Sequence, residues 1–370
     1  MIRNQPKREG GYLAMVTFMF VVAGCSAPAP TAREAPRPFD IVHSHPLIEV
    51  GVDPSLPICG RSMEYIDRFV ERYVDASSYG SYDEPATFYY LAPEHAEEIC
   101  GRMGCAGGGF AYSSWLTHPH ELVHVIRQHQ QVPRSHRFFE EGAAQLHDAS
   151  IRPHWPDGFE ISDALQFADD VPGTHYDQAG HLMSYVRHRY SYAAVETLLD
   201  EMADITTADE IEEGLVAALG VGIDQLETDY RETYPHCDGI GWSEMLAECS
   251  DEPLPWEVDA DGRRFIEELI PDFACEHPEA IGPAEGRVWT SFTFDIEEPE
   301  AYLVQVPGIE GMHFELGSCD LGCDRAVTLQ SNYDELSIVV EFPAGRHVVR
   351  LSRKLDEPGR IGFRMLGASP

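Results

Sequence analysis

Hydrophobic and polar positions follow two different periods along this chain, and the change of period divides it. Between residues 39 and 250, two short strand-like runs are followed mainly by stretches with the 3.6-residue spacing of amphipathic helices. Beyond residue 258, short apolar segments are separated by Pro, Gly and Asp. The linker-like sequence Asp-Glu-Pro-Leu-Pro at 251–255 lies between them. The pattern therefore predicts one domain over 39–250 and a second over 258–370.

The first domain is expected to place strands before helices. Its periodicity predicts strands at 47–50 and 87–91, and helices at 62–76, 93–100, 176–188, 193–202 and within 215–234. This order of elements indicates an α+β fold.

The second domain has the pattern of an all-β sandwich. Strands are predicted at 289–294, 301–306, 337–340, 347–351 and 361–365. The sequence Pro-Ala-Gly-Arg-His-Val-Val at 343–349 weakly resembles the pre-peptidase C-terminal-type domains that are appended to secreted bacterial proteases. That resemblance implies an appended sandwich and assigns it no chemistry.

The segment Thr-His-Pro-His-Glu-Leu-Val-His at 117–124 carries the clearest chemistry. Residues four apart lie on one face of a helix, so His120 and His124 can direct two imidazoles at one metal ion, with Glu121 beside it. Zinc prefers neutral histidine nitrogens, and a catalytic zinc site has three protein ligands and an open position for water. A third ligand is therefore expected elsewhere.

Glu141 is the predicted third ligand, seventeen residues beyond His124. It precedes Gly142 in the segment Phe-Phe-Glu-Glu-Gly-Ala-Ala-Gln-Leu, where small residues favour close helix packing. His-Glu-x-x-His followed by aromatic-x-x-Glu-Gly-x-Ala resembles the gluzincin, or thermolysin-like, metallopeptidases, in which the Glu before Gly binds zinc. The resemblance implies an N-terminal mixed sheet with a helical half, one catalytic Zn²⁺ ion and peptide hydrolysis, although the motif alone would allow another amide. It also implies an edge strand at 107–112, just before the metal motif, whose free backbone groups could bind an extended peptide.

A role for two further residues follows from this ligand set. Glu121 is expected to act as general base, taking a proton from the attacking water and passing it to the leaving amine. Tyr176 opens a Tyr-x-x-Ala-Gly segment that is similar to one in the helical half of gluzincin-like peptidases, and it is a candidate for stabilising the oxyanion. His154 and His175 are alternatives for that task.

Several other interpretations compete with the metallopeptidase. A metzincin would need Gly at 127 and His at 130, where this chain has Arg127 and Gln130. A solvated, histidine-rich helix is disfavoured by its apolar residues. A catalytically inactive zinc-binding lipoprotein, acting as a binding or structural module, would need a fourth ligand such as His118 or His147. The remaining alternative is a binding lipoprotein whose C-terminal sandwich carries the binding function.

The net charge of -37 excludes a nucleic-acid-binding surface and indicates a solvated, exported protein. Residues 1–24 have a basic start, an apolar run and a small-residue cleavage site, as in a signal peptide. Cys25 follows in Val-Ala-Gly-Cys, which resembles the lipobox of bacterial lipoproteins, and 25–38 is a Pro/Ala-rich tether. We expect a cell-envelope lipoprotein anchored to a bacterial membrane by lipid on Cys25, with a peptide or protein substrate.

Eight further cysteines are an even number in an exported protein, which favours disulfides. Cys100 with Cys105, and Cys319 with Cys323, are close enough in sequence to close small loops. The other four, Cys59, Cys237, Cys249 and Cys275, allow three connectivities. A cysteine zinc site is disfavoured because the sequence has no pair of Cys-x-x-Cys motifs.

Overall fold

The computed structural model describes residues 37–148, 161, 171, 175–205, 207–234, 243–320, 329–331 and 335–367. Within these residues the fold is mixed α+β, with eight α-helices and three mostly antiparallel sheets. The predicted signal peptide, Cys25, most of the tether, His154, Cys237 and Cys323 lie outside the described residues. No helix in the described part of the chain has the length and apolar character that crossing a bilayer requires.

The first sheet has five strands in the order β1-β2-β3-β5-β4. Their bounds are Ile41–Ser44, Ile48–Val52, Ala86–Tyr90, Phe110–Ser113 and Gly104–Gly107 in that order. β2, β3 and β5 run parallel, and the two outer strands pair antiparallel to their neighbours. The edge strands of this sheet are therefore β1 and β4, and the expectation of an edge strand at 107–112 is wrong. A tight turn at Gly108-Gly109 places β5 in the interior of the sheet, where it pairs on both sides.

Helices α1 (Ser62–Ala76) and α3 (Pro119–His129) pack with this sheet in one apolar core. α1 has its apolar residues on one face, with Tyr65, Ile66, Phe69 and Val70 buried. α3 begins with Pro119, which is pre-organised for the first helical position. Every residue of α3 from Pro119 to Arg127 is buried, so the metal-motif helix lies inside the protein. α2 (Pro93–Cys100) packs at the β4–β5 side of the sheet.

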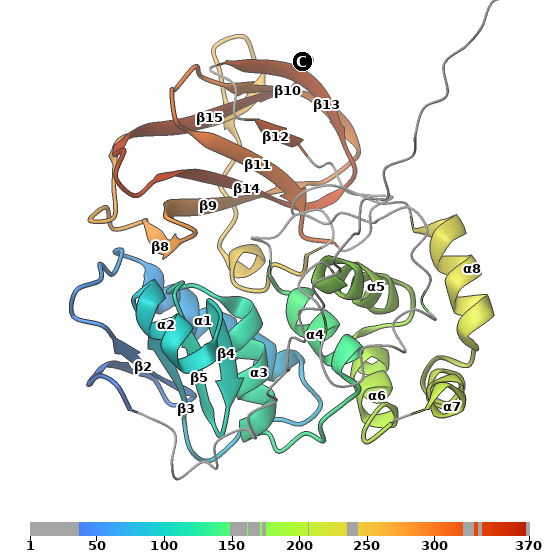
Figure 1. Ribbon diagram of the computed structural model, residues 1–370. Helices are drawn as coiled ribbons and strands as arrows, with labels where there is room; N and C mark the ends of the chain where they lie inside the picture. Colours follow the sequence, from blue (N-terminus) through green and yellow to red (C-terminus); the bar gives the residue numbers. More distant parts are fainter. Residues whose placement is uncertain are drawn as a thin grey trace, which may run out of the picture.

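The remaining helices form a second apolar core. They are α4 (Arg137–Gln145), α5 (Tyr176–Arg189), α6 (Tyr192–Glu201), α7 (Ala208–Leu219) and α8 (Ile223–Thr233). α4 lies against α5 closely, because an added Cβ on Gly142 would come within 2.6 Å of the Ala179 carbonyl oxygen. Figure 1 shows α3 and α4 side by side between the sheet and the other helices. The two cores therefore meet where α3 and α4 meet.

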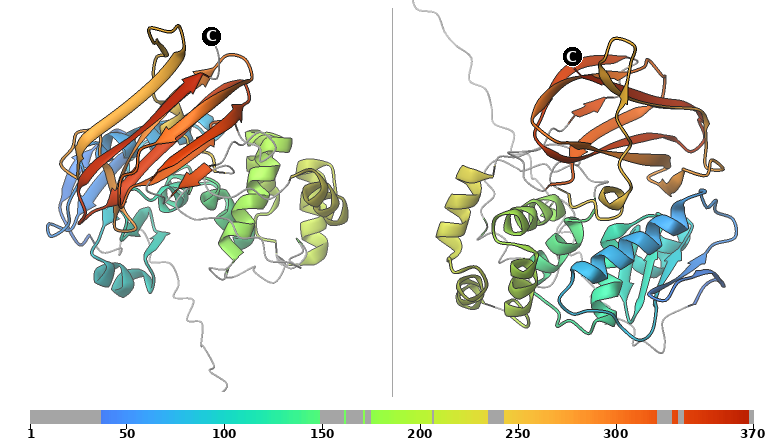
Figure 2. Two further views of the ribbon diagram at one scale, coloured as in Figure 1. Left: turned by 90° about the horizontal axis from the view of Figure 1, so that it is seen from above. Right: turned by 180° about the vertical axis from the view of Figure 1, so that it is seen from behind.

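Residues 257–367 form two five-stranded antiparallel sheets, a sandwich-like arrangement that agrees with the predicted all-β part. One sheet has the order β13-β10-β15-β7-β6 and the other β12-β11-β14-β9-β8. In chain order, β6 to β15 are Glu257–Val258, Arg264–Phe273, Ile281–Ala284, Arg287–Ile296, Glu300–Val306, His313–Ser318, Leu329–Ser331, Leu336–Phe342, Gly345–Lys354 and Gly359–Gly367. Figure 2 shows the two sheets face to face, and their facing sides share one apolar core.

Two disulfides join this sandwich to the N-terminal part. Cys59, just before α1, bonds to Cys275, and Cys249 in the short helix η4 (Glu248–Ser250) bonds to Cys319. The prediction that Cys319 pairs with Cys323 is therefore wrong, because η4 brings Cys249 to the end of β11. The third disulfide, Cys100–Cys105, closes the small loop that its spacing predicted.

A partly buried ion pair reinforces the same junction. Arg350 of β14 donates to Glu248 over 2.8 Å, and its guanidinium lies 4.7 Å from the centre of the Trp289 ring. Trp289 in turn contacts Tyr65 of α1 edge to face, with ring centres 5.1 Å apart. The sandwich is thus fixed against the helix that supports the first sheet.

Candidate metal centre

The described residues contain one group of histidine, cysteine and acidic side chains that could hold a metal ion: His120, His124 and Glu141. The Nε2 atom of His120 lies 2.9 Å from Glu141 Oε2, and that of His124 lies 3.2 Å from the same oxygen. The two Nε2 atoms are 3.2 Å apart. All three side chains are buried. The two histidines come from one face of α3, and the glutamate comes from α4 across the junction of the two cores.

The dimensions of this triangle suit a small cation. Zinc bonded tetrahedrally at ~2.0–2.1 Å holds its ligand atoms about 3.3 Å apart. The three separations here are 2.9, 3.2 and 3.2 Å. Two imidazole nitrogens and a carboxylate oxygen that converge in this way favour a shared cation, and nitrogen and oxygen donors are the ligands of catalytic zinc sites. The residues therefore fit a zinc ion with three protein ligands and an open position.

Gln145 orients the first histidine. Its Oε1 atom lies 3.1 Å from Nδ1 of His120, so Nδ1 can donate to the amide oxygen, and Nε2, the nitrogen nearest Glu141, is the one that would bind a cation. Gln145 is fully buried on α4, four residues beyond Glu141 and on the same face. A fixed tautomer of this kind is what a metal-binding histidine requires.

The acidic pair on α4 divides into one inward and one outward carboxylate. Glu141 is 1% exposed, and its second oxygen contacts Arg137. Glu140 is half-buried and lies 3.4 Å from Arg137 Nη1, away from the ligand triangle. Burial would raise the pKa of Glu141, but the charge of His124 and hydrogen bonds from both histidines hold that pKa well below its usual range. The pKa of His120 is raised, because its bond to Glu141 outweighs burial.

Glu121 lies beside the triangle, against the edge strand. A Cβ added to Gly104 of β4 would come within 2.8 Å of Glu121 Oε1, so a larger residue at this position would displace the carboxylate. Glu121 and His124 both line a cavity of about 190 Å³, together with Ala106 and Gly107 of β4. The predicted base, a predicted ligand and the outermost strand of the described sheet thus line one space.

Tyr176, at the start of α5, lies over the ligands. Its ring stacks on His120 with centres 5.6 Å apart, and its hydroxyl oxygen accepts a hydrogen bond of 2.9 Å from Arg102 Nη1. Burial and the charge of Glu141 raise the pKa of Tyr176. The hydroxyl is therefore protonated at neutral pH, and its own proton is left to donate to a ligand.

The other residues considered from the sequence lie outside the ligand group. His118 hydrogen-bonds Ser113 Oγ at 2.7 Å and lies 3.8 Å from Asp148, behind His120. His147 contacts the Glu244 carbonyl oxygen at 3.3 Å and packs on Tyr73. His175 hydrogen-bonds Gln178. None of the three joins the metal group of the described residues, which leaves that group with three candidate ligands.

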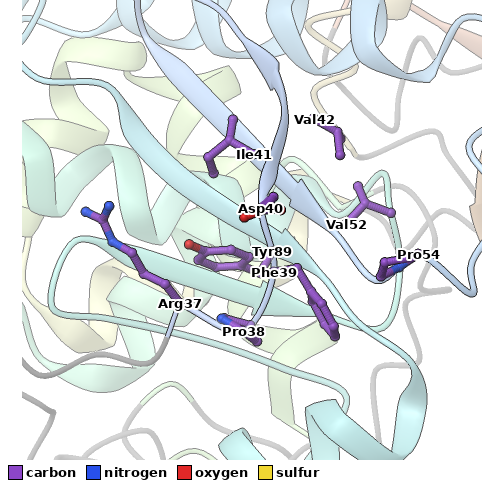
Figure 3. A pocket seen from close by; sticks show the side chains of 9 residues that line it. All are labelled: Arg37, Pro38, Phe39, Asp40, Ile41, Val42, Val52, Pro54 and Tyr89. Carbon is purple, nitrogen blue, oxygen red and sulfur yellow. The ribbon is translucent and has the colours of Figure 1, made fainter.

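Figure 3 shows a larger cavity, of about 560 Å³, at the beginning of the described chain. Arg37, Phe39 and Tyr89 are among the residues that line it. No histidine and none of the predicted ligands reaches it. We therefore place the candidate site at the smaller cavity, which Glu121 and His124 line.

Three residues at this site were not predicted from the sequence: Gln145, Arg137 and Arg102. Gln145 and Arg137 lie four residues after and before Glu141, so helical spacing around the predicted ligand was a usable signal. Arg102 lies in the loop between α2 and β4 and reaches Tyr176 only through the tertiary fold. No sequence spacing identifies it.

Comparison with known proteins identifies no family for this chain and only weak structural similarities. No protein-family model matches the chain, and no curated protein is similar to it in sequence. Among solved structures, the pre-peptidase C-terminal domain of a Bacillus anthracis collagenase is weakly similar, with 10% identity, a TM-score of 0.19, and 27% of this chain and 84% of that chain covered. The periplasmic g-type lysozyme inhibitor PliG of Aeromonas hydrophila has 7% identity and a TM-score of 0.18, with 28% and 82% covered. The gluzincin family is not shown by these findings and stays a prediction.

Proposed function

We propose that this protein is a gluzincin-type zinc metallopeptidase that hydrolyses peptide bonds. The observation that carries the proposal is the buried triangle of His120, His124 and Glu141, with ligand atoms 2.9 to 3.2 Å apart. Three ligands leave a position for water, which distinguishes catalytic from structural zinc sites. Glu121 adds a carboxylate at the same cavity, as the His-Glu-x-x-His motif requires of a base.

When bound, zinc would supply Lewis-acid chemistry, acidifying a water molecule and polarising a carbonyl group. Glu121 takes the proton of the attacking water and then protonates the leaving amine. Tyr176 donates its hydroxyl proton in a hydrogen bond to the oxygen that becomes negative, while Arg102 holds the tyrosine oxygen from behind. Gln145 keeps His120 in the tautomer that binds a cation. The edge strand β4 can hold an extended peptide by backbone hydrogen bonds.

Chelation tests the proposal directly. Purified protein should contain about one zinc ion per chain and should digest casein. A chelator should abolish the digestion, and added zinc should restore it, because the proposed chemistry needs the metal. Metal analysis and casein digestion on the same sample provide the measurement. Stoichiometric zinc without chelator-sensitive hydrolysis would favour the inactive zinc-binding module, and the absence of zinc binding would contradict both.

We also propose that the protein is exported and lipid-anchored through Cys25. Changing Cys25 to Ser should move it from the membrane fraction to the soluble exported fraction, because a thiol is needed for lipidation and the sequence that follows is Pro-rich. Fractionation and mass spectrometry measure this outcome, and an unchanged zinc content serves as the control. A membrane-bound variant, or an unlipidated natural protein, would count against the anchor.

A further inference from the structure

The cavity beside Glu121 and His124 differs in charge from the rest of the protein. The chain has 26 lysines and arginines among 370 residues and a net charge of -37. Four of the 13 residues that line this cavity are nevertheless arginines: Arg102, Arg127, Arg134 and Arg137. The carboxylates among the lining residues are Glu121 and Glu140, and Glu141 contacts Arg137 from beyond the lining. We call these four arginines and the cavity of about 190 Å³ that they line the arginine pocket.

Two of the four arginines already have carboxylate partners. Arg137 contacts Glu141 and lies 3.4 Å from Glu140, and Arg134 lies 3.9 Å from Glu140. Arg127 is buried against Tyr73 and forms no ion pair within the described chain. It contributes positive charge from the wall of the pocket, and dissolved salt screens this charge little because the side chain is buried.

Arg102 is the arginine best placed to meet a ligand. It is exposed, and its hydrogen-bond partner among the described residues is the Tyr176 hydroxyl, while the charges of Glu121 and Glu141 act on it from a longer range. A guanidinium has five N–H donors, so one bond to Tyr176 leaves donors for a second group. The disulfide Cys100–Cys105 closes the loop that carries Arg102, which restricts where its backbone can move. The side chain therefore stands between the proposed oxyanion donor and the pocket.

We propose that the arginine pocket binds a carboxylate of the substrate next to the bond that is cleaved, with Arg102 making the direct contact. This inference rests on the proposed peptidase function and names its substrate class: peptides with Asp or Glu near the cleaved bond, or with a free C-terminal carboxylate there. A planar guanidinium suits either group, because its fork of donors matches the two carboxylate oxygens. The acidic surface elsewhere would repel such peptides, so the pocket supplies the local attraction.

Matched peptides test the inference. One set replaces Glu with Gln at single positions around a bond that the protein cleaves, and a second compares a free C-terminus with its amide. In one of the two sets, the zinc-loaded protein should cleave the carboxylate form with a kcat/KM about tenfold to a hundredfold higher than that of the neutral form. This is the range of a charge-assisted hydrogen bond. Which set shows the preference identifies the source of the carboxylate.

Variants of Arg102 then assign the effect to this residue. Arg102→Gln should remove the preference, Arg102→Lys should restore part of it, and Arg102→Glu should reverse it in favour of lysine-containing peptides. Arg360→Gln, at an exposed arginine in the sandwich, is the matched control and should keep the preference. Zinc content checks that each variant keeps its site.

The outcomes separate the two proposals. Cleavage of no peptide by the zinc-loaded protein would overturn the peptidase function and this inference with it. Equal cleavage of acidic and neutral peptides would overturn the inference alone. If Arg102→Gln lowers kcat equally for acidic and neutral peptides and leaves their ratio unchanged, Arg102 acts only by positioning Tyr176, and carboxylate binding by Arg102 is refuted.

Discussion

Replacing Glu121 with glutamine is expected to lower kcat by about 10²–10⁴-fold while zinc stays bound, because general acid–base catalysis contributes about that much. Glutamine fills nearly the same volume as glutamate, which matters at a position where Gly104 leaves little room. It cannot accept a proton at neutral pH. The ligand atoms of His120, His124 and Glu141 are untouched by the change.

Zinc content and peptide turnover of the variant, measured on one preparation, test this expectation. Glu213→Gln, an exposed glutamate of α7 far from the ligands in the chain, is the matched control and should behave as the unmodified protein does. Turnover at the normal rate by Glu121→Gln would show that the base is another group. Loss of zinc together with turnover would mean that Glu121 supports the site and not the proton transfer.

The helices of the N-terminal part followed from sequence because their signals are local. α1 and α2 have the predicted bounds, since each shows its apolar spacing within its own segment and α2 begins with a proline. The order of the strands in the first sheet could not be predicted from the sequence. Gly104–Gly107 has almost no side chains to show a period, so β4 was missed and its neighbour was assigned to the edge.

The sandwich shows the same limit. β9, β10, β13, β14 and β15 were predicted because each contains a short apolar run bounded by Pro, Gly or Asp. β7 (Arg264–Phe273) was missed, since it carries several acidic residues and Pro271 on a partly exposed strand. The pairing of Cys249 with Cys319 also could not be predicted from the sequence, because it depends on how the sandwich lies against the N-terminal part.

The sequence led us to expect that His120, His124 and Glu141 would converge, as they do, but not which residues would surround them. His120 and His124 come from one turn of helix, so their spacing alone predicts that they converge. Their meeting with Glu141 needed the family resemblance, since it depends on the packing of α3 with α4. Arg102 reaches the site through a disulfide-closed loop, and no local pattern records that contact.

The choice between the two neighbouring acids of α4 tests the family assignment most sharply. Successive residues on a helix point about 100° apart, so only one of the pair can face α3. The Oε2 atom of Glu141 lies 2.9 and 3.2 Å from the two histidine nitrogens, whereas Glu140 faces Arg134 and Arg137. Glu141→Ala is therefore expected to weaken zinc binding by more than the ~10–100-fold typical of losing a group that only supports a ligand.

Zinc titrations of Glu141→Ala, Glu141→Gln and Glu140→Ala decide between the two acids. Glu141→Gln keeps the volume and removes the charge, so it separates a lost metal bond from a cavity beside Arg137. Glu140→Ala should change zinc affinity little, because its carboxylate only pairs with arginines at the rim of the arginine pocket. A larger loss from Glu140→Ala would shift the motif by one residue and refute the resemblance. Small, equal losses from all three would place the third ligand elsewhere, with Asp148 the nearest remaining carboxylate in sequence.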